Sequence, residues 1–149
     1  MLDALPRHRI AHFACHALTD PRSPALNRLL LHDHLSAPLT AIELSVVNTP
    51  ADLVYLSACK TARPAAALAD EAIHVATALQ MAGYRHVIAT LWFTADDAAS
   101  RIAQHFYANL VPTLNTDDTA RTLHRAIRAA RAEAPTSPSR WVAHIQFGP

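Results

Sequence analysis

The strongest constraint on the fold is a continuous apolar strand near the middle of the chain. Residues Asp52–Ser57 (DLVYLS) contain four consecutive apolar residues. Such a run is typical of a strand in a parallel sheet, where helices bury both of its faces. The segment therefore predicts a parallel sheet that is covered by helices on both sides.

Further strand and helix patterns alternate around this segment. Strand patterns are present at Arg9–Cys15, Leu29–Leu31, His86–Trp92 and Trp141–Phe147. Helix patterns are present at Leu35–Val47 with Thr40 as a cap, Pro64–Met81 ended by Gly83, Asp96–Leu110 and Asp117–Glu133. This alternation predicts an α/β fold with a mostly parallel sheet. A length of 149 residues, 51% of them apolar, suits one domain spanning residues 1–149.

Composition argues against several classes of partner. The formal net charge is +1 and charged residues make up 17% of the chain, so we expect no nucleic-acid or membrane partner. We see no secretory signal and no apolar stretch long enough for a membrane span. Two cysteines cannot form a disulfide framework, which favours a cytoplasmic location. Abundant alanine and arginine suggest a bacterial source.

Two reactive side chains follow predicted strands. His16 comes directly after the first strand, and Cys59 comes two residues after Ser57. Ligands of α/β sheets bind beyond the carboxyl ends of strands, and a neighbouring imidazole turns a thiol into a nucleophile. Spacing alone is a weak signal for a Cys–His pair, because a buried cysteine is more often structural and one of ten histidines can follow a strand by chance.

The sequence around these residues resembles the CHAT domain, a family in the caspase–separase clan of cysteine peptidases. The resemblance is carried by AHFACHA at 11–17 and LVYLSACKTA at 53–62. Segments 29–44, 70–92 and the ending WVAHIQFGP fit the same family. The resemblance implies a caspase-like three-layer fold, in which a mostly parallel sheet lies between helices.

The resemblance also implies roles for individual residues in a cysteine endopeptidase without a cofactor. Cys59 would attack the scissile carbonyl as a thiolate, and His16 would assist it and protonate the leaving amine. The backbone N–H groups of Cys59 and Ala17 would form the oxyanion hole. The family usually has glycine at position 17, so a positive φ there would strain the alanine.

Three further residues are candidates for the site. Asp96 and Asp97 follow the His86–Trp92 strand, where peptidases of this clan build a specificity pocket, so either could favour Arg or Lys before the cut. Both also suit the first turn of a helix, where the dipole stabilises carboxylates. His12 is either a core residue or a support for the site. Cys15 is expected to contribute packing.

The resemblance leaves two other questions of function open. Relatives carry βα structure upstream of the first strand, so we expect the N-terminal part of the fold to be missing, and many relatives bear TPR repeats. A protein or peptide substrate, or a TPR-containing or effector partner, is therefore expected. The main alternative is a non-catalytic interaction module of the same fold. A third is a metal site among His8, His12, His16, His32, Asp33 and His34, although their spacing matches no closed zinc motif.

Overall fold

The chain folds around a four-stranded sheet with strand order β1-β5-β6-β7. The structure is a computed structural model that describes residues 1–18, 20, 23–57 and 75–149. The strands of this sheet are β1 (Ile10–Phe13), β5 (Ala51–Leu56), β6 (Tyr84–Thr90) and β7 (His144–Phe147). The first three run parallel, while β7 is antiparallel to β6. The predicted mostly parallel sheet is thus confirmed.

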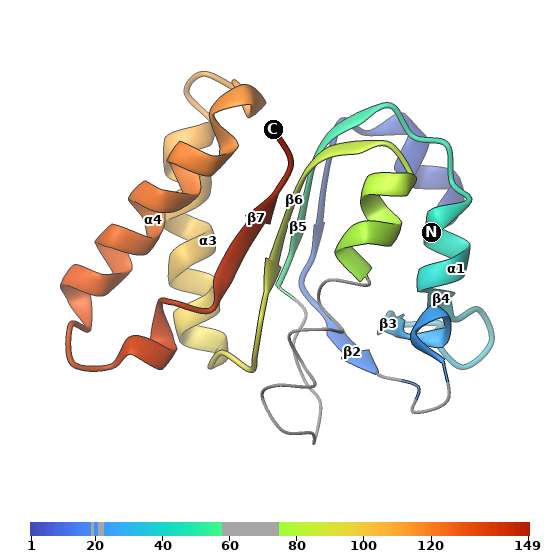
Figure 1. The fold of residues 1–149 in the computed structure, drawn as a ribbon, viewed down its shortest axis with the longest axis horizontal. Coiled ribbons are helices and arrows are strands. Elements are labelled where there is room, and N and C mark those ends of the chain that lie inside the picture. The colour runs from blue at the N-terminus through green and yellow to red at the C-terminus, as the bar shows by residue number, and fades with distance from the viewer. Residues whose placement is uncertain (19, 21–22, 58–74) are drawn as a thin grey trace.

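Helices cover both faces of the sheet (Figure 1). One face carries α3 (Asp96–Leu110) and α4 (Thr119–Glu133), and η3 (Thr116–Asp118) leads into α4. The other face carries α1 (Ala41–Ser45) and helical residues 75–81. The remaining short helices are η1 (Leu2–Arg7), η2 (Pro24–Leu26) and η4 (Pro138–Arg140). None of the helices described is long and apolar enough to cross a bilayer.

Several predicted boundaries agree with the structure, and others shift for identifiable reasons. The helix Asp96–Leu110 is confirmed to the residue. Thr40 caps α1 through a capping box with Glu43, but α1 is shorter than predicted. Gly83 follows residues 75–81 with φ 108°, as expected for a glycine that ends a helix. The start of the predicted helix at Pro64 lies outside the described residues.

The core forms one cluster on each face of the sheet. Leu53 and Tyr55 pack against α3 and α4, where Phe106 is fully buried. Their neighbours Val54 and Leu56 point to the opposite face and join the cluster that includes α1. Both faces of β5 are therefore buried, which is the physical reason for its unbroken apolar sequence.

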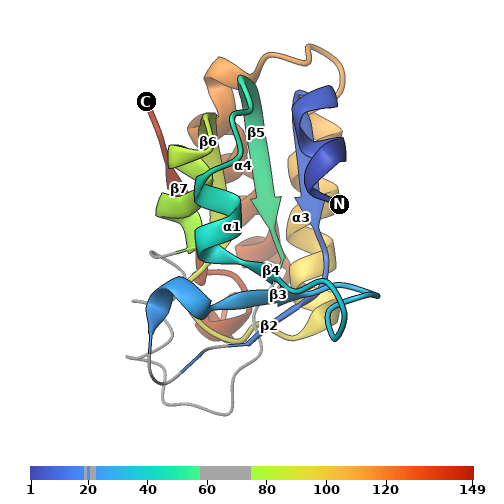
Figure 2. The ribbon, with the colours of Figure 1, turned by 90° about the vertical axis from the view of Figure 1, so that its right-hand side faces the viewer.

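A second, smaller sheet lies beyond the carboxyl end of β1 (Figure 2). It contains β2 (His16–Leu18), β3 (Arg28–Leu30) and β4 (Leu39–Thr40), which pair antiparallel in the order β2-β3-β4. Strands of two or three residues carry too little periodicity to be predicted from the sequence. Because of this sheet, the chain turns away after Phe13 and places His16 at the start of a new strand.

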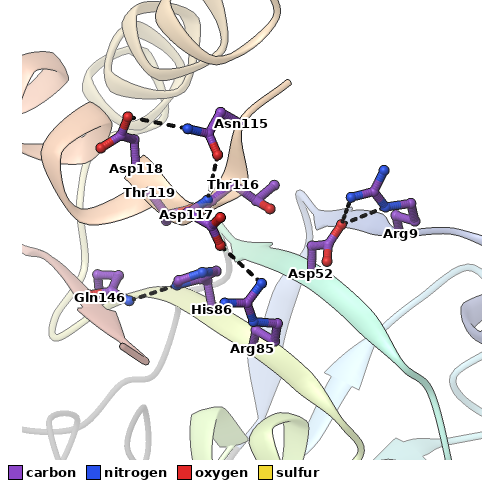
Figure 3. Close-up of polar contacts among 10 residues, drawn as sticks. All are labelled: Arg9, Asp52, Arg85, His86, Asn115, Thr116, Asp117, Asp118, Thr119 and Gln146. Carbon is purple, nitrogen blue, oxygen red and sulfur yellow. Dashed lines mark hydrogen bonds and ion pairs between the residues drawn. The ribbon is translucent and has the colours of Figure 1, made fainter. Parts of the chain in front are cut away.

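Polar contacts cluster at the amino ends of β5 and β6, the end of the main sheet that lies away from the second sheet (Figure 3). Asp52 accepts a 2.6 Å hydrogen bond from Nε of Arg9, and Arg85 forms a 2.9 Å ion pair with Asp117. The amide of Gln146 donates to Nδ1 of the buried His86 at 3.3 Å. These contacts stabilise that end of the sheet and leave the carboxyl ends of the strands as the open end.

Candidate functional site

A cleft of about 610 Å³ opens at the carboxyl ends of β1, β5 and β6. Its walls come from the strand ends, the start of β2 and the first two turns of α3. The lining residues are His12, Ala14, Cys15, His16, Leu30, Ser57, Thr90, Thr94, Asp96, Ala99, Ser100 and Ala103. Histidine, serine, threonine and aspartate side chains thus surround one cavity at the end of the sheet where ligands of α/β folds bind.

His16 lies in this cleft at the first position of β2. Its side chain is exposed, and its backbone is held by the antiparallel register that places it opposite Leu30. Ala17 follows within the same strand. Among the described residues other than glycine, only Leu114 has a positive φ. The alanine at position 17 is therefore not strained.

Cys59 and its backbone N–H lie outside the described residues, so the predicted Cys59–His16 contact stays a prediction. Ser57 is the last described residue before it, and its half-buried side chain lines the cleft. The backbone N–H of Ser57 donates to the carbonyl oxygen of Phe13 at 2.9 Å, which continues the parallel ladder past the end of β5.

His12 contacts Ser57 across the same two strands. The distance from His12 Nε2 to Ser57 Oγ is 2.9 Å. The imidazole lies 4.8 Å from the ring of Tyr55 and 5.6 Å from that of Tyr107, measured between ring centroids. One side of the imidazole is open to the cleft, and burial of the remainder lowers the pKa of His12. The ring is thus biased toward the neutral form, and the tautomer with an unprotonated Nε2 can accept a hydrogen bond from the hydroxyl of Ser57.

Cys15 also lines the cleft, but its thiol is poorly suited to nucleophilic chemistry. The side chain is half-buried and packs against the core cluster on the α1 face. Burial raises the pKa of the Cys15 thiol from 9.0 to about 11. Because the thiolate is the reactive form, this environment suppresses reactivity.

The structure separates the two candidate carboxylates of α3. Asp96 lines the cleft, whereas Asp97 forms an ion pair with Arg140. A hydrogen bond from Arg140 lowers the pKa of Asp97. Asp97 is therefore paired with the last residue of η4, while Asp96 lines the cleft.

Four polar residues of the cleft were not among the predicted site residues: Ser57, Thr90, Thr94 and Ser100. Signals for two of them were present in the sequence. Ser57 directly follows a strand, and Ser100 lies four residues after Asp96, on the same face of the predicted helix. Thr90 is the last residue of β6. Because the predicted strand extends to Trp92, the sequence does not place Thr90 at the end of a strand.

The histidine-rich segments form no metal centre within the described residues. No three His, Cys, Asp or Glu side chains among them lie close enough to hold an ion. His34 instead contacts the carbonyl oxygen of Leu31 through Nδ1 at 2.8 Å.

The comparison with known families agrees with the geometry. The family model for the CHAT domain matches residues 1–149. No curated protein matches the chain at a significant level.

Proposed function

Because the chain belongs to the CHAT domain family, a caspase-like domain family, we propose that it is a cysteine endopeptidase domain with Cys59 as nucleophile and His16 as its acid–base partner. His16 takes the proton of the Cys59 thiol, and the thiolate attacks the scissile carbonyl. The backbone N–H groups of Cys59 and Ala17 bind the oxyanion. His16 then protonates the leaving amine, and water hydrolyses the thioester.

The register between β1 and β5 is the observation that carries this proposal. The ladder pairs each residue of β1 with the residue 43 positions later, from Ile10 with Leu53 to Phe13 with Leu56. His16 and Cys59 are separated by the same 43 positions. Two residues span at most about 7 Å, so Cys59 is tethered within that distance of Ser57 in the cleft wall. This tether supports the proposal that Cys59 can reach the cleft that His16 lines.

We further propose that Asp96 favours substrates with Arg or Lys before the cut. Asp96 is exposed and lines the cleft, and a carboxylate there can give a substrate guanidinium a bidentate, charge-assisted contact. Asp97 is already paired with Arg140 and has no such role. The two neighbouring aspartates are thus a matched test and control.

The experiment uses a peptidyl acyloxymethyl ketone that ends in arginine, a probe that alkylates an active thiol. We expect labelling of Cys59 in the native protein, and its loss in both Cys59→Ala and His16→Ala. Cys15→Ala should label normally. Folded protein that is not labelled at Cys59 would contradict the peptidase and favour a non-catalytic interaction module of the same fold.

Specificity is tested with a second probe that ends in norleucine instead of arginine. Asp96→Asn should slow labelling by the arginine probe by about tenfold or more and leave the norleucine probe unaffected, because removing one charged partner costs about 1.5–3 kcal/mol. Asp97→Asn should preserve the preference for arginine. Equal effects of the two substitutions would rule out the role of Asp96.

A further inference from the structure

Two hydrogen bonds connect β1 to the point where the chain leaves β5. The backbone N–H of Ser57 donates to the carbonyl oxygen of Phe13 at 2.9 Å. One residue earlier on β1, the side chain of His12 contacts the hydroxyl of Ser57, also at 2.9 Å. Ser57 is therefore held through its main chain and its side chain, and only one residue separates it from Cys59.

Aromatic packing fixes the orientation of the imidazole in this pair. Tyr55 lies opposite His12 in the β1–β5 register, and its ring is tilted by 43° to the imidazole at 4.8 Å. Tyr107 of α3 contacts the imidazole at 5.6 Å. Tyr55 is fully buried, so these rings form a rigid support below the cleft.

We propose that His12 and Ser57 form a positioning pair, which fixes the exit of the chain from β5 and thereby the placement of the Cys59 thiol. This inference rests on the proposed function. His12 acts through Ser57 and does not itself contact the reacting atoms. Hydrogen bonds of this kind add only about 1 kcal/mol to stability, whereas a shift of about 1 Å at a reacting group can slow the chemistry roughly 100-fold. A positioning role therefore affects the rate far more than the stability.

Substitutions at position 12 can separate the hydrogen bond from the ring packing. His12→Phe keeps an aromatic ring on Tyr55 and removes the hydrogen bond. His12→Gln keeps a hydrogen-bonding group at a similar reach and removes the ring. Ser57→Ala removes the other partner, and His124→Phe on the exposed surface of α4 is the matched control.

The primary measurement is the rate at which the arginine-ending probe labels Cys59 in the full chain. We expect His12→Phe and Ser57→Ala each to slow labelling roughly 10- to 100-fold, with the double variant no slower than either one. His12→Gln should recover most of the rate, and His124→Phe should match the native protein. The proposed pair would be refuted if the two substitutions slowed labelling independently, so that the double variant showed the product of their effects. A native labelling rate in His12→Phe would also refute it.

Hydrogen exchange of the Ser57 amide gives a readout that does not depend on peptidase activity. If the native thiol is unreactive, the proposed function fails, but the pair is still tested by this amide. We expect faster exchange in His12→Phe and near-native exchange in His12→Gln. Unchanged exchange in His12→Phe would show that the side-chain contact does not hold the end of β5, and would overturn the inference.

Discussion

Cys15 should react slowly with thiol reagents even though it lines the cleft. Burial raises the pKa of its thiol from 9.0 to about 11. Well below pH 9, a difference of about two pKa units lowers the thiolate fraction roughly 100-fold. The more basic thiolate is intrinsically more nucleophilic, and a Brønsted coefficient of about 0.4–0.5 recovers up to about tenfold. The net expectation is a rate about tenfold below that of an ordinary thiol.

The assay uses the Cys59→Ala variant, in which Cys15 is the only cysteine. Reaction with a neutral pyridyl disulfide is followed by the absorbance of the released thiopyridone, in native protein and in denaturant. We expect the rate in native protein to be at least about tenfold lower than the rate in denaturant. Half-burial of Cys15 also limits access of the reagent and lowers the native rate further. The rate should continue to rise with pH beyond pH 9.

Two results would refute the reasoning about Cys15. A native rate equal to the rate in denaturant would show that the thiol is not desolvated. A rate that stops rising near pH 9 would show that its pKa is ordinary. Either result would also mean that thiol labelling of the native chain cannot be assigned to Cys59 without the Cys15→Ala variant.

Three further predictions concern stability, measured by urea unfolding. Gly83→Ala should lower the free energy of unfolding by about 2 kcal/mol or more, because φ is 108° and a Cβ would lie 2.3 Å from the carbonyl oxygen of Thr49. Phe106→Ala should lower it by about 3–5 kcal/mol, since this fully buried ring fills the core between the sheet and α3. Burial lowers the pKa of His144 from 6.5 to about 4, so the unfolded chain binds a proton more readily and stability falls as the pH drops from 6.5 toward 4. His144→Leu should remove up to about 3 kcal/mol of this pH dependence and be neutral or stabilising at pH 7.

Exposed positions provide the controls for these measurements. Met81→Ala and His124→Ala alter exposed side chains and should change the free energy of unfolding by less than about 0.5 kcal/mol. If the free energy of unfolding of His144→Leu depends on pH as the native protein's does, then His144 is not the source of the loss of stability below pH 6.5. Gly83→Ala with native stability would contradict the close approach to Thr49.

Much of the main sheet could be predicted because its signals are local. The run Leu53–Leu56 is apolar at every position because the structure buries both of its faces, and α3 shows its apolar stripe from Ile102 to Leu110. The ends of strands were less accurate. Trp141 was predicted to start the last strand, but its indole N–H donates to the carbonyl oxygen of Ala134 at 3.0 Å. This contact holds Trp141 against the end of α4, and β7 begins only at His144.

The candidate site could likewise be predicted only in part. The sequence marked the ends of β1 and β5 as the place for chemistry, and His16 and Asp96 do line one cleft. It could not distinguish Asp96 from Asp97, because the ion pair of Asp97 is made with Arg140, 43 residues away. It also gave no sign that His12 contacts Ser57, since that distance depends on the parallel register of two strands.

By itself, the sequence determined the strands of the main sheet, the two long helices and the family that the chain resembles, because periodicity, caps and short motifs depend on a few neighbouring residues. Only the tertiary structure decided that His16 starts a strand of a second sheet, that Cys15 is desolvated beside it, and which aspartate faces the cleft. These properties arise from contacts between residues far apart in the chain, and their energies depend on burial that exists only after the sheet and its helices have packed.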